Sequence, residues 1–97
     1  MILRAFALRD MKADNFHAPF FVPSPIQAIR LLGQLVQDKN SELGKWPGDF
    51  TLYEIGTYET STGFMTGNLP SEICTALSCL PKPDPRQLTL NDAGIVG

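Results

Sequence analysis

Apolar and polar residues alternate most regularly between residues 49 and 64, and this stretch predicts a β-hairpin. Aromatic and β-branched residues recur there at the two-residue spacing of a strand. One predicted face carries Thr51, Tyr53, Ile55 and Thr57, and the other carries Leu52, Glu54, Gly56 and Tyr58. Residues 59–63 are a short polar connection, and Gly63 suits the left-handed conformation of a type I turn with a bulge. Phe64 is expected to begin the return strand.

Two further strands are expected near the N-terminus. Residues 2–9 combine β-branched and aromatic residues with alanines at alternate positions, which is typical of a strand. Residues 10–15 are expected to form a polar turn. Residues 16–22 are rich in aromatic side chains but contain Pro19, which cannot donate a hydrogen bond to a neighbouring strand. They therefore predict a short second strand at a sheet edge.

The next segment has the period of an amphipathic helix. Ser24 is expected to cap its N-terminus, Pro25 suits the first helical position, and Gln27 completes a capping box. The predicted apolar stripe comprises Ala28, Ile29, Leu31, Leu32, Leu35 and Val36, and the polar stripe comprises Gln27, Arg30, Gln34, Gln37 and Ser41. The helix is expected to end near Asn40, and residues 41–48 are expected to form a loop.

These elements predict an α+β fold. It is a small antiparallel sheet, with elements in β-β-α-β-β order, covered on one face by one amphipathic helix. Residues 70–80 fit either a short helix or a last strand, and the helix is favoured because Ser71 and Glu72 suit a helix start. Residues 1–80 are long enough to form a single domain with its own core.

Residues 81–97 differ in character and predict an extended or flexible C-terminal tail. Prolines alternate there with charged residues, and this spacing prevents helix formation. The tail is expected either to be a flexible terminus or to be an arm that docks on a neighbouring subunit. The apolar side chains available to such an arm are Leu88, Leu90, Ile95 and Val96.

Composition indicates a globular cytoplasmic protein. Apolar stretches are too short to span a membrane, and residues 1–9 resemble a strand rather than a signal peptide. Cys74 and Cys79 lack the spacing of metal ligands, so buried free thiols in a reducing compartment are expected, with a disulfide between them as the alternative.

Charge is unevenly distributed along the chain, whose net charge is −2. Residues 1–48 hold six basic and four acidic residues, whereas residues 49–80 hold four acidic residues and no basic one. The asymmetry permits a basic face and an acidic face, although two ordinary solvated surfaces explain it equally well. The negative total argues against coating of nucleic acid by bulk electrostatics.

Catalytic and metal-binding patterns are not evident in the sequence. His17 is the single histidine, and a histidine next to a phenylalanine is usually structural. The chain has no glycine-rich phosphate loop, nucleophile elbow or Cys-x-x-Cys pair. We therefore expect a protein that is not an enzyme and that holds neither a metal nor a cofactor.

Single-stranded DNA binding is the most specific hypothesis that the residues themselves support. Proteins hold single strands on aromatic platforms interleaved with basic side chains. Both kinds of residue are close together in the first half of the chain, where Phe16, Phe20, Phe21 and Trp46 lie near Arg9, Lys12, Arg30 and Lys45. A core this small also needs aromatic residues, so only rings that stay exposed could stack on bases.

Four motifs carry a family resemblance. They are Asp10-x-Lys12-Ala13, Phe16-x-x-Pro19-Phe20-Phe21, Ala28-x-Arg30 and, the most specific, Asp49-Phe50-x-Leu52-Tyr53-Glu54-Ile55-Gly56-x-Tyr58-Glu59-x-x-Thr62-Gly63. They resemble the small nonstructural protein of gokushovirus-type microviruses, which are tailless phages with circular single-stranded DNA genomes. The resemblance covers the chain up to the hairpin return and does not extend beyond Pro81. It implies an early or replication-stage phage protein in the host cytoplasm that binds DNA, and it brings no catalytic residues.

Residues and resemblance together give one functional hypothesis. A homodimer presents basic and aromatic side chains to the genomic single strand between duplex replication and packaging. The candidate DNA-binding residues are Arg4, Arg9, Lys12, Phe16, Phe21, Arg30, Lys45 and Trp46. Dimerisation would double a small basic patch and cover an exposed sheet edge. The alternative is a protein-interaction module, scaffold-like or directed at a host protein, that uses the acidic hairpin face and the tail without binding nucleic acid.

Overall fold

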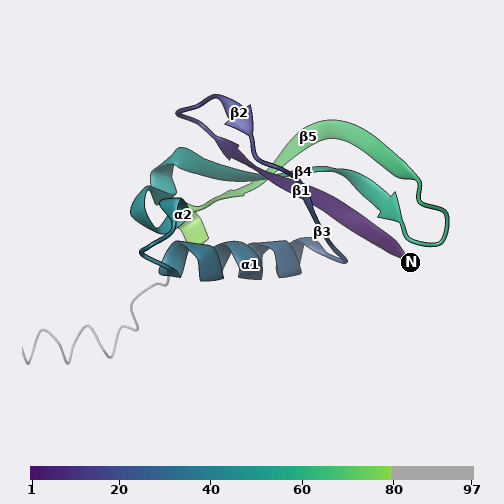
Figure 1. Ribbon diagram of the computed structural model, residues 1–97, viewed down its shortest axis with the longest axis horizontal. Coiled ribbons are helices and arrows are strands. Elements are labelled where there is room, and N and C mark those ends of the chain that lie inside the picture. The colour runs from purple at the N-terminus through teal and green to yellow at the C-terminus, as the bar shows by residue number, and fades with distance from the viewer. Residues whose placement is uncertain (80–97) are drawn as a thin grey trace, which may run out of the picture.

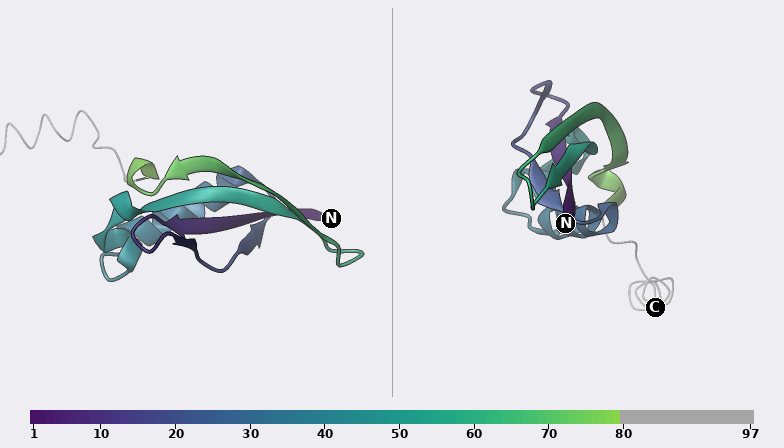
Figure 2. Two further views of the ribbon diagram at one scale, coloured as in Figure 1. Left: turned by 90° about the horizontal axis from the view of Figure 1, so that it is seen from above. Right: turned by 90° about the vertical axis from the view of Figure 1, so that its right-hand side faces the viewer.

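The computed structural model describes residues 1–79, which form an antiparallel sheet with one long helix against one of its faces (Figures 1 and 2). The strands are β1 (Ile2–Asp10), β2 (Asn15–Phe16), β3 (Phe20–Val22), β4 (Phe50–Glu59) and β5 (Met65–Thr75). The helices are α1 (Pro25–Gln37) and α2 (Glu42–Lys45), and two 3-10 turns are η1 (Pro47–Asp49) and η2 (Leu77–Cys79). The predicted α+β class is confirmed. The predicted tail at 81–97 and the domain boundary at residue 80 lie outside the described residues and stay predictions.

Strand β1 is the centre of the sheet. One of its edges pairs with β4, which in turn pairs with β5, and its other edge pairs with both β2 and β3. The single second strand predicted at residues 16–22 is therefore wrong. It is divided into β2 and β3 because Pro19, which has no N–H to donate, lies between the two short pairings.

Helix α1 begins where the sequence predicts. Ser24 has extended backbone angles at the N-cap and Pro25 occupies the first turn, but the Ser24 side chain makes no capping hydrogen bond, so the predicted capping box does not form. The helix ends at Gln37 rather than near Asn40, because Asp38 leaves helical geometry and its carboxylate accepts a hydrogen bond of 2.9 Å from the Asn40 amide. No helix within residues 1–79 is long and apolar enough to cross a membrane.

The loop expected at residues 41–48 contains a helical turn. Ser41 is the N-cap of α2, and its hydroxyl oxygen accepts a 3.0 Å hydrogen bond from the Gly44 amide. The same oxygen lies 2.8 Å from the Leu35 carbonyl oxygen and 2.7 Å from that of Asp38, so Ser41 connects α2 to the end of α1. Four residues are too few to show helical periodicity, which is why the sequence pattern did not indicate α2.

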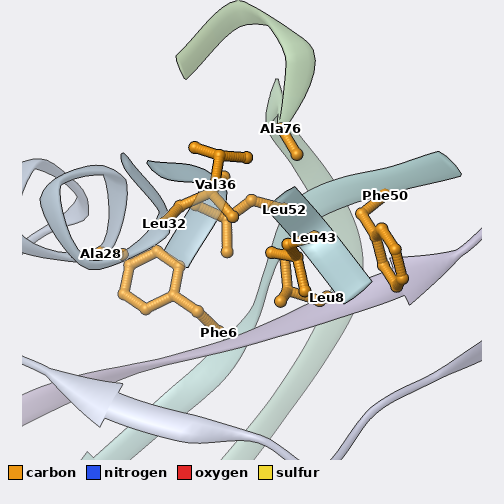
Figure 3. Packing of buried hydrophobic residues seen from close by; sticks show 9 residues of the cluster. All are labelled: Phe6, Leu8, Ala28, Leu32, Val36, Leu43, Phe50, Leu52 and Ala76. Carbon is orange, nitrogen blue, oxygen red and sulfur yellow. The ribbon is translucent and has the colours of Figure 1, made fainter. Parts of the chain in front are cut away.

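The core lies between α1, α2 and one face of the sheet (Figure 3). Its buried side chains are Phe6, Leu8, Ala28, Leu32, Val36, Leu43, Phe50, Leu52 and Ala76. The predicted apolar stripe of α1 is wider than the buried one, since Leu31 and Leu35 are exposed. Both leucines instead flank an apolar hollow of about 240 Å³ beside the helix, which Leu8 and Phe20 also line.

The hairpin of β4 and β5 has the predicted turn. Gly63 has a φ of 78°, in the left-handed region, and its amide donates to the Glu59 carbonyl oxygen. The return strand begins at Met65, one residue after the predicted start. The favoured helix at residues 70–80 is wrong over 70–75, because β4 offers a long edge to which β5 pairs as far as Thr75. Only η2 follows, and residue 80 lies outside the described residues.

Candidate functional site

The face of the sheet opposite α1, here called the helix-free face, carries two pairs of aromatic rings. Phe16 of β2 and Tyr53 of β4 have ring centroids 5.3 Å apart in an edge-to-face arrangement. Phe21 of β3 and Tyr58 of β4 have centroids 5.6 Å apart and are tilted by 52°. Each pair joins a strand on one side of β1 to the strand on its other side. The rings therefore meet across the central strand.

Two alanines of β1 make room for these ring pairs. Ala5 is opposite Phe21 in β3, and Ala7 is opposite Tyr53 in β4. Their neighbours Phe6 and Leu8 point into the core, so the two alanines point to the helix-free face. Ala5 is nevertheless only 3% exposed and Ala7 only 1% exposed. Both alanines lie in the part of β1 that the two ring pairs cross.

A β-bulge in β4 brings both tyrosines to the same face. Phe6 pairs with Glu54 and Ala5 pairs with Gly56, so Ile55 has no partner in β1 and is the extra residue. The simple alternation predicted from sequence placed Tyr53 and Tyr58 on opposite faces, and this prediction is wrong. One extra residue reverses the alternation beyond it, so Tyr58 returns to the side that Tyr53 occupies.

Arg9 is the basic residue on the helix-free face. It is the β1 partner of Phe16, and its guanidinium forms an ion pair with Asp14 in the turn between β1 and β2. Hydrogen bonds to Asp14 and then to Tyr53 raise the pKa of Arg9, since both stabilise the charged form. Arg9 is therefore fixed by Asp14 next to Phe16, one member of the Phe16–Tyr53 ring pair.

The turn that supplies Asp14 also presents Lys12. The Asp10 carboxylate accepts hydrogen bonds from the backbone amides of Lys12 and Ala13 at 2.9 and 3.0 Å. Asp14 closes the turn with a φ of 57°, a left-handed conformation that aspartate tolerates better than most residues. Lys12 is exposed in this turn, at the same end of β1 as Arg9.

The other predicted DNA-binding residues lie elsewhere. Arg4 points to the core side of the sheet, where it donates two hydrogen bonds of 2.9 and 2.7 Å to the Glu54 carboxylate. Arg30 is exposed on α1, and Lys45 and Trp46 are exposed at the end of α2, whose Leu43 belongs to the core layer. The expectation that all eight residues share one surface is therefore wrong.

Three of the eight predicted residues do lie together on the helix-free face, namely Arg9, Phe16 and Phe21, and Lys12 adjoins them. The structure adds Tyr53 and Tyr58, which the sequence pattern did not indicate because only the bulge brings both to this face. The face also has an acidic side, since Glu72 of β5 is the cross-strand partner of Tyr53. Its charge thus changes from basic near β2 to acidic at β5.

His17 has a packing contact in the structure. Its ring lies 5.6 Å from that of Phe50, edge to face, and its backbone amide donates to the Leu8 carbonyl oxygen at 2.8 Å. Among residues 1–79, no group of three or more His, Cys, Asp or Glu side chains is arranged to hold a metal ion. The helix-free face therefore offers aromatic surface and cationic nitrogen atoms, which suit stacking and phosphate contacts.

Comparison with known proteins gives one match. Residues 3–79 match the family described as Phage ORF5 protein, so the match includes β1, α1 and the whole hairpin. No curated protein and no solved structure matches the chain. The matched region lies within the described residues and contains both aromatic ring pairs. This chain is a member of the Phage ORF5 protein family.

Proposed function

We propose that this phage accessory protein binds single-stranded DNA on its helix-free face. It would act as a nonstructural protein of a microvirus-type phage, in the host cytoplasm, during genome replication or packaging, and it would bind rather than catalyse. The observation that carries the proposal is that two ring pairs lie along one face of the sheet, the one opposite α1, with Arg9 next to the Phe16–Tyr53 pair. Stacking of a base on an aromatic ring contributes about 1–3 kcal/mol without requiring a particular sequence.

The ring pairs are spaced along β1. Phe16 pairs with Arg9 and Phe21 pairs with Ala5, four residues further back in the strand. Four residues of strand span about 13 Å at roughly 3.3 Å each. A stacked single strand advances about 3.4 Å per nucleotide, so the two platforms are about four stacked nucleotides apart, and fewer when the strand is extended. One strand running along β1 can therefore contact both.

The charge of the face limits the electrostatic contribution. Arg9 is partly neutralised by Asp14, and Lys12 is the other cation near the rings. Two phosphate contacts on a single strand would give a slope of about −1.4 in log affinity against log salt. Most of the binding free energy would then come from stacking. A homodimer, which we propose as the binding species, would double both the cations and the rings.

The proposal is tested by fluorescence anisotropy with a labelled oligonucleotide at low salt. Phe16→Ala should weaken binding by about 5- to 150-fold, the equivalent of one lost stacking contact. Phe64→Ala is the matched control, because Phe64 is 74% exposed but lies in the hairpin turn. Arg9→Gln should also weaken binding, whereas Arg30→Gln on α1 should not. Circular dichroism checks that each variant is folded.

Two outcomes contradict the proposal. One is the absence of binding at low salt by the unmodified protein. The other is that the Phe64 and Arg30 variants lose as much affinity as the Phe16 and Arg9 variants, which would indicate unspecific attraction. The homodimer is tested separately by light scattering, and a monomer at concentrations where DNA is bound would exclude it.

A protein-interaction module is the second candidate, and one observation favours it. Strand β5 lies at the sheet edge and exposes Met65 and Leu69. Residues 49–79, to which β5 belongs, include no Lys or Arg. Such a surface suits a protein partner better than a nucleic acid. Pro70 lies in the middle of β5, so contact through side chains is more suitable than addition of another strand. This alternative predicts capture of a phage or host protein from infected-cell lysate that survives nuclease treatment.

A further inference from the structure

The two cysteines of the chain lie sulfur to sulfur. Cys74 is in β5 and Cys79 ends η2, and their Sγ atoms are 3.6 Å apart. Both are free thiols and both are half-buried. The sequence left open whether the two cysteines meet, because the contact depends on how the chain turns after β5.

Hydrogen bonds within the turn hold the two thiols together. The Ser78 hydroxyl donates to the Thr75 carbonyl oxygen at 2.7 Å, and the Cys79 amide donates to that of Ala76 at 3.0 Å. Ala76 is fully buried, and its amide donates to the Phe50 carbonyl oxygen in β4 at 2.9 Å. Ala76, which lies between the two cysteines in the chain, therefore fixes the turn to the sheet.

The pair lies between β5 and α1. Cys74 is the cross-strand partner of Leu52, a core residue, so its side chain is on the core side of the sheet. Cys79 also approaches α1 at Gly33. If this glycine carried a β-carbon, that atom would lie 3.9 Å from the carbonyl oxygen of Cys79. Both cysteines pack against the core cluster. The pair is thus on the opposite side of the sheet from the helix-free face.

We propose that Cys74 and Cys79 are a dithiol modification site, which a small disulfide of the glutathione class converts to an intramolecular disulfide. In the first step the Cys79 thiolate attacks one sulfur of the small disulfide, a mixed disulfide forms, and one small thiol leaves. In the second step Cys74 attacks Sγ of Cys79, the Cys74–Cys79 bond forms and the second small thiol leaves. The protons of the two cysteine thiols end on the two released thiols. The protein loses two electrons, and the small disulfide gains them.

Cys74 acts second in this sequence, because it lies within β5 opposite the core residue Leu52, whereas Cys79 ends the turn that follows the strand. Burial, and then the hydrogen bond with Cys79, raise the pKa of Cys74 to about 11. A thiol with such a pKa is almost fully protonated at neutral pH and is a poor first nucleophile, because the thiolate is the attacking species. Once Cys79 carries the mixed disulfide, Cys74 is in contact with the sulfur that it must attack. The intramolecular step is then favoured by proximity.

The new bond would join the end of η2 to β5. Because it closes only a short loop, it constrains the unfolded chain modestly, and the thermal midpoint of the oxidised protein is expected to be higher than that of the reduced protein. Since the site is on the core side of the sheet, oxidation is expected to leave the aromatic ring pairs in place. The inference does not depend on the proposed DNA binding.

The test uses the full chain, first reduced and then incubated with oxidised glutathione. After free thiols are blocked by alkylation, intact mass should show a monomer that has lost two hydrogen atoms and carries no glutathione or alkyl group. Cys74→Ser should instead retain one glutathione, which peptide mapping places on Cys79. Cys79→Ser should react more slowly than Cys74→Ser. Cys74→Ala, which adds no hydroxyl to the core, replaces Cys74→Ser if the latter does not fold.

Three results would overturn the proposal. The unmodified protein could retain one or two stable glutathione adducts, form disulfide-linked dimers, or keep two thiols that alkylation still detects. Each would show that the contact of 3.6 Å between the Sγ atoms does not become an internal disulfide. Equal reaction rates of the two serine variants would contradict the assigned order of attack.

Discussion

A β-carbon on Gly56 would lie 2.1 Å from the carbonyl oxygen of Thr66 in the neighbouring strand β5. The obstacle is backbone, which cannot turn aside as a flexible side chain does, so β4 and β5 would have to separate locally. This close approach occurs next to the bulge at Ile55. Gly56 therefore permits the close approach of β4 and β5 directly after the bulge that turns Tyr58 to the helix-free face.

Gly56→Ala is expected to destabilise the protein by about 1–3 kcal/mol, the usual cost of forcing extra atoms into a packed region. Gly67→Ala is the matched control in β5, because a β-carbon there meets nothing within 4 Å. The control should change the free energy of unfolding by about 0.5 kcal/mol or less. Urea denaturation measures both, and equal losses would show that the approach to Thr66 is not what restricts residue 56.

Ala7→Val should disturb the aromatic pair that meets across β1. Ala7 is 1% exposed and lies opposite Tyr53, so added methyl groups compete with the rings for space. We expect a loss of about 1–3 kcal/mol in the free energy of unfolding and a changed near-ultraviolet circular dichroism signal from Tyr53. Ala18→Val, at an exposed position, is the control and should leave both unchanged. A valine at residue 7 with wild-type stability and spectrum would contradict the ring arrangement.

The variants Ser41→Ala and Ser24→Ala compare an N-cap serine whose side chain accepts a hydrogen bond from the helix with one whose side chain does not. The Ser41 hydroxyl oxygen accepts from the Gly44 amide, whereas Ser24 makes no side-chain cap bond. Losing a cap bond typically costs about 1 kcal/mol, so Ser41→Ala should be less stable by that amount. Ser24→Ala should lie within about 0.5 kcal/mol of the parent protein. Chemical denaturation of both variants shows which one has the lower free energy of unfolding.

Glu59 should contribute to the pH dependence of stability. Its carboxylate accepts hydrogen bonds from the Met1 amine at 2.8 Å and from the Ser61 amide and hydroxyl. The bond from the amine, followed by those from Ser61, lowers the pKa of Glu59 from 4.5 to about 2. A folded-state pKa below the unfolded value stabilises the fold at higher pH, so the contribution is present above pH 4.5 and is lost as the pH falls toward 2.

Glu59→Gln removes this carboxylate and tests its effect. The stability difference between the parent protein and Glu59→Gln should be largest near neutral pH and should shrink through the interval from 4.5 to 2. Urea denaturation at several pH values, on protein with a free N-terminal amine, provides the measurement. Parallel pH profiles for the two proteins would rule out the contribution of Glu59.

Several elements could be predicted because their signals are local. Pro25 restricts the backbone to the first turn of a helix, and Gly63 accepts a left-handed turn that other residues resist. The candidate site was less predictable. Phe16, Phe21 and Arg9 were selected from composition, but so were Arg4 and Arg30, which the fold directs to the other side. Residue type shows that a side chain can stack or pair, and does not show which face it occupies.

The sequence by itself determined strand β1, the start of α1 and the hairpin turn, since each depends on neighbouring residues only. Tertiary structure alone decided that Tyr53 and Tyr58 share the helix-free face with Phe16 and Phe21. That outcome depends on one unpaired residue, Ile55, whose insertion is defined by the register between β1 and β4. Register is a property of two segments distant in the chain, so a two-residue period read along one of them cannot specify it.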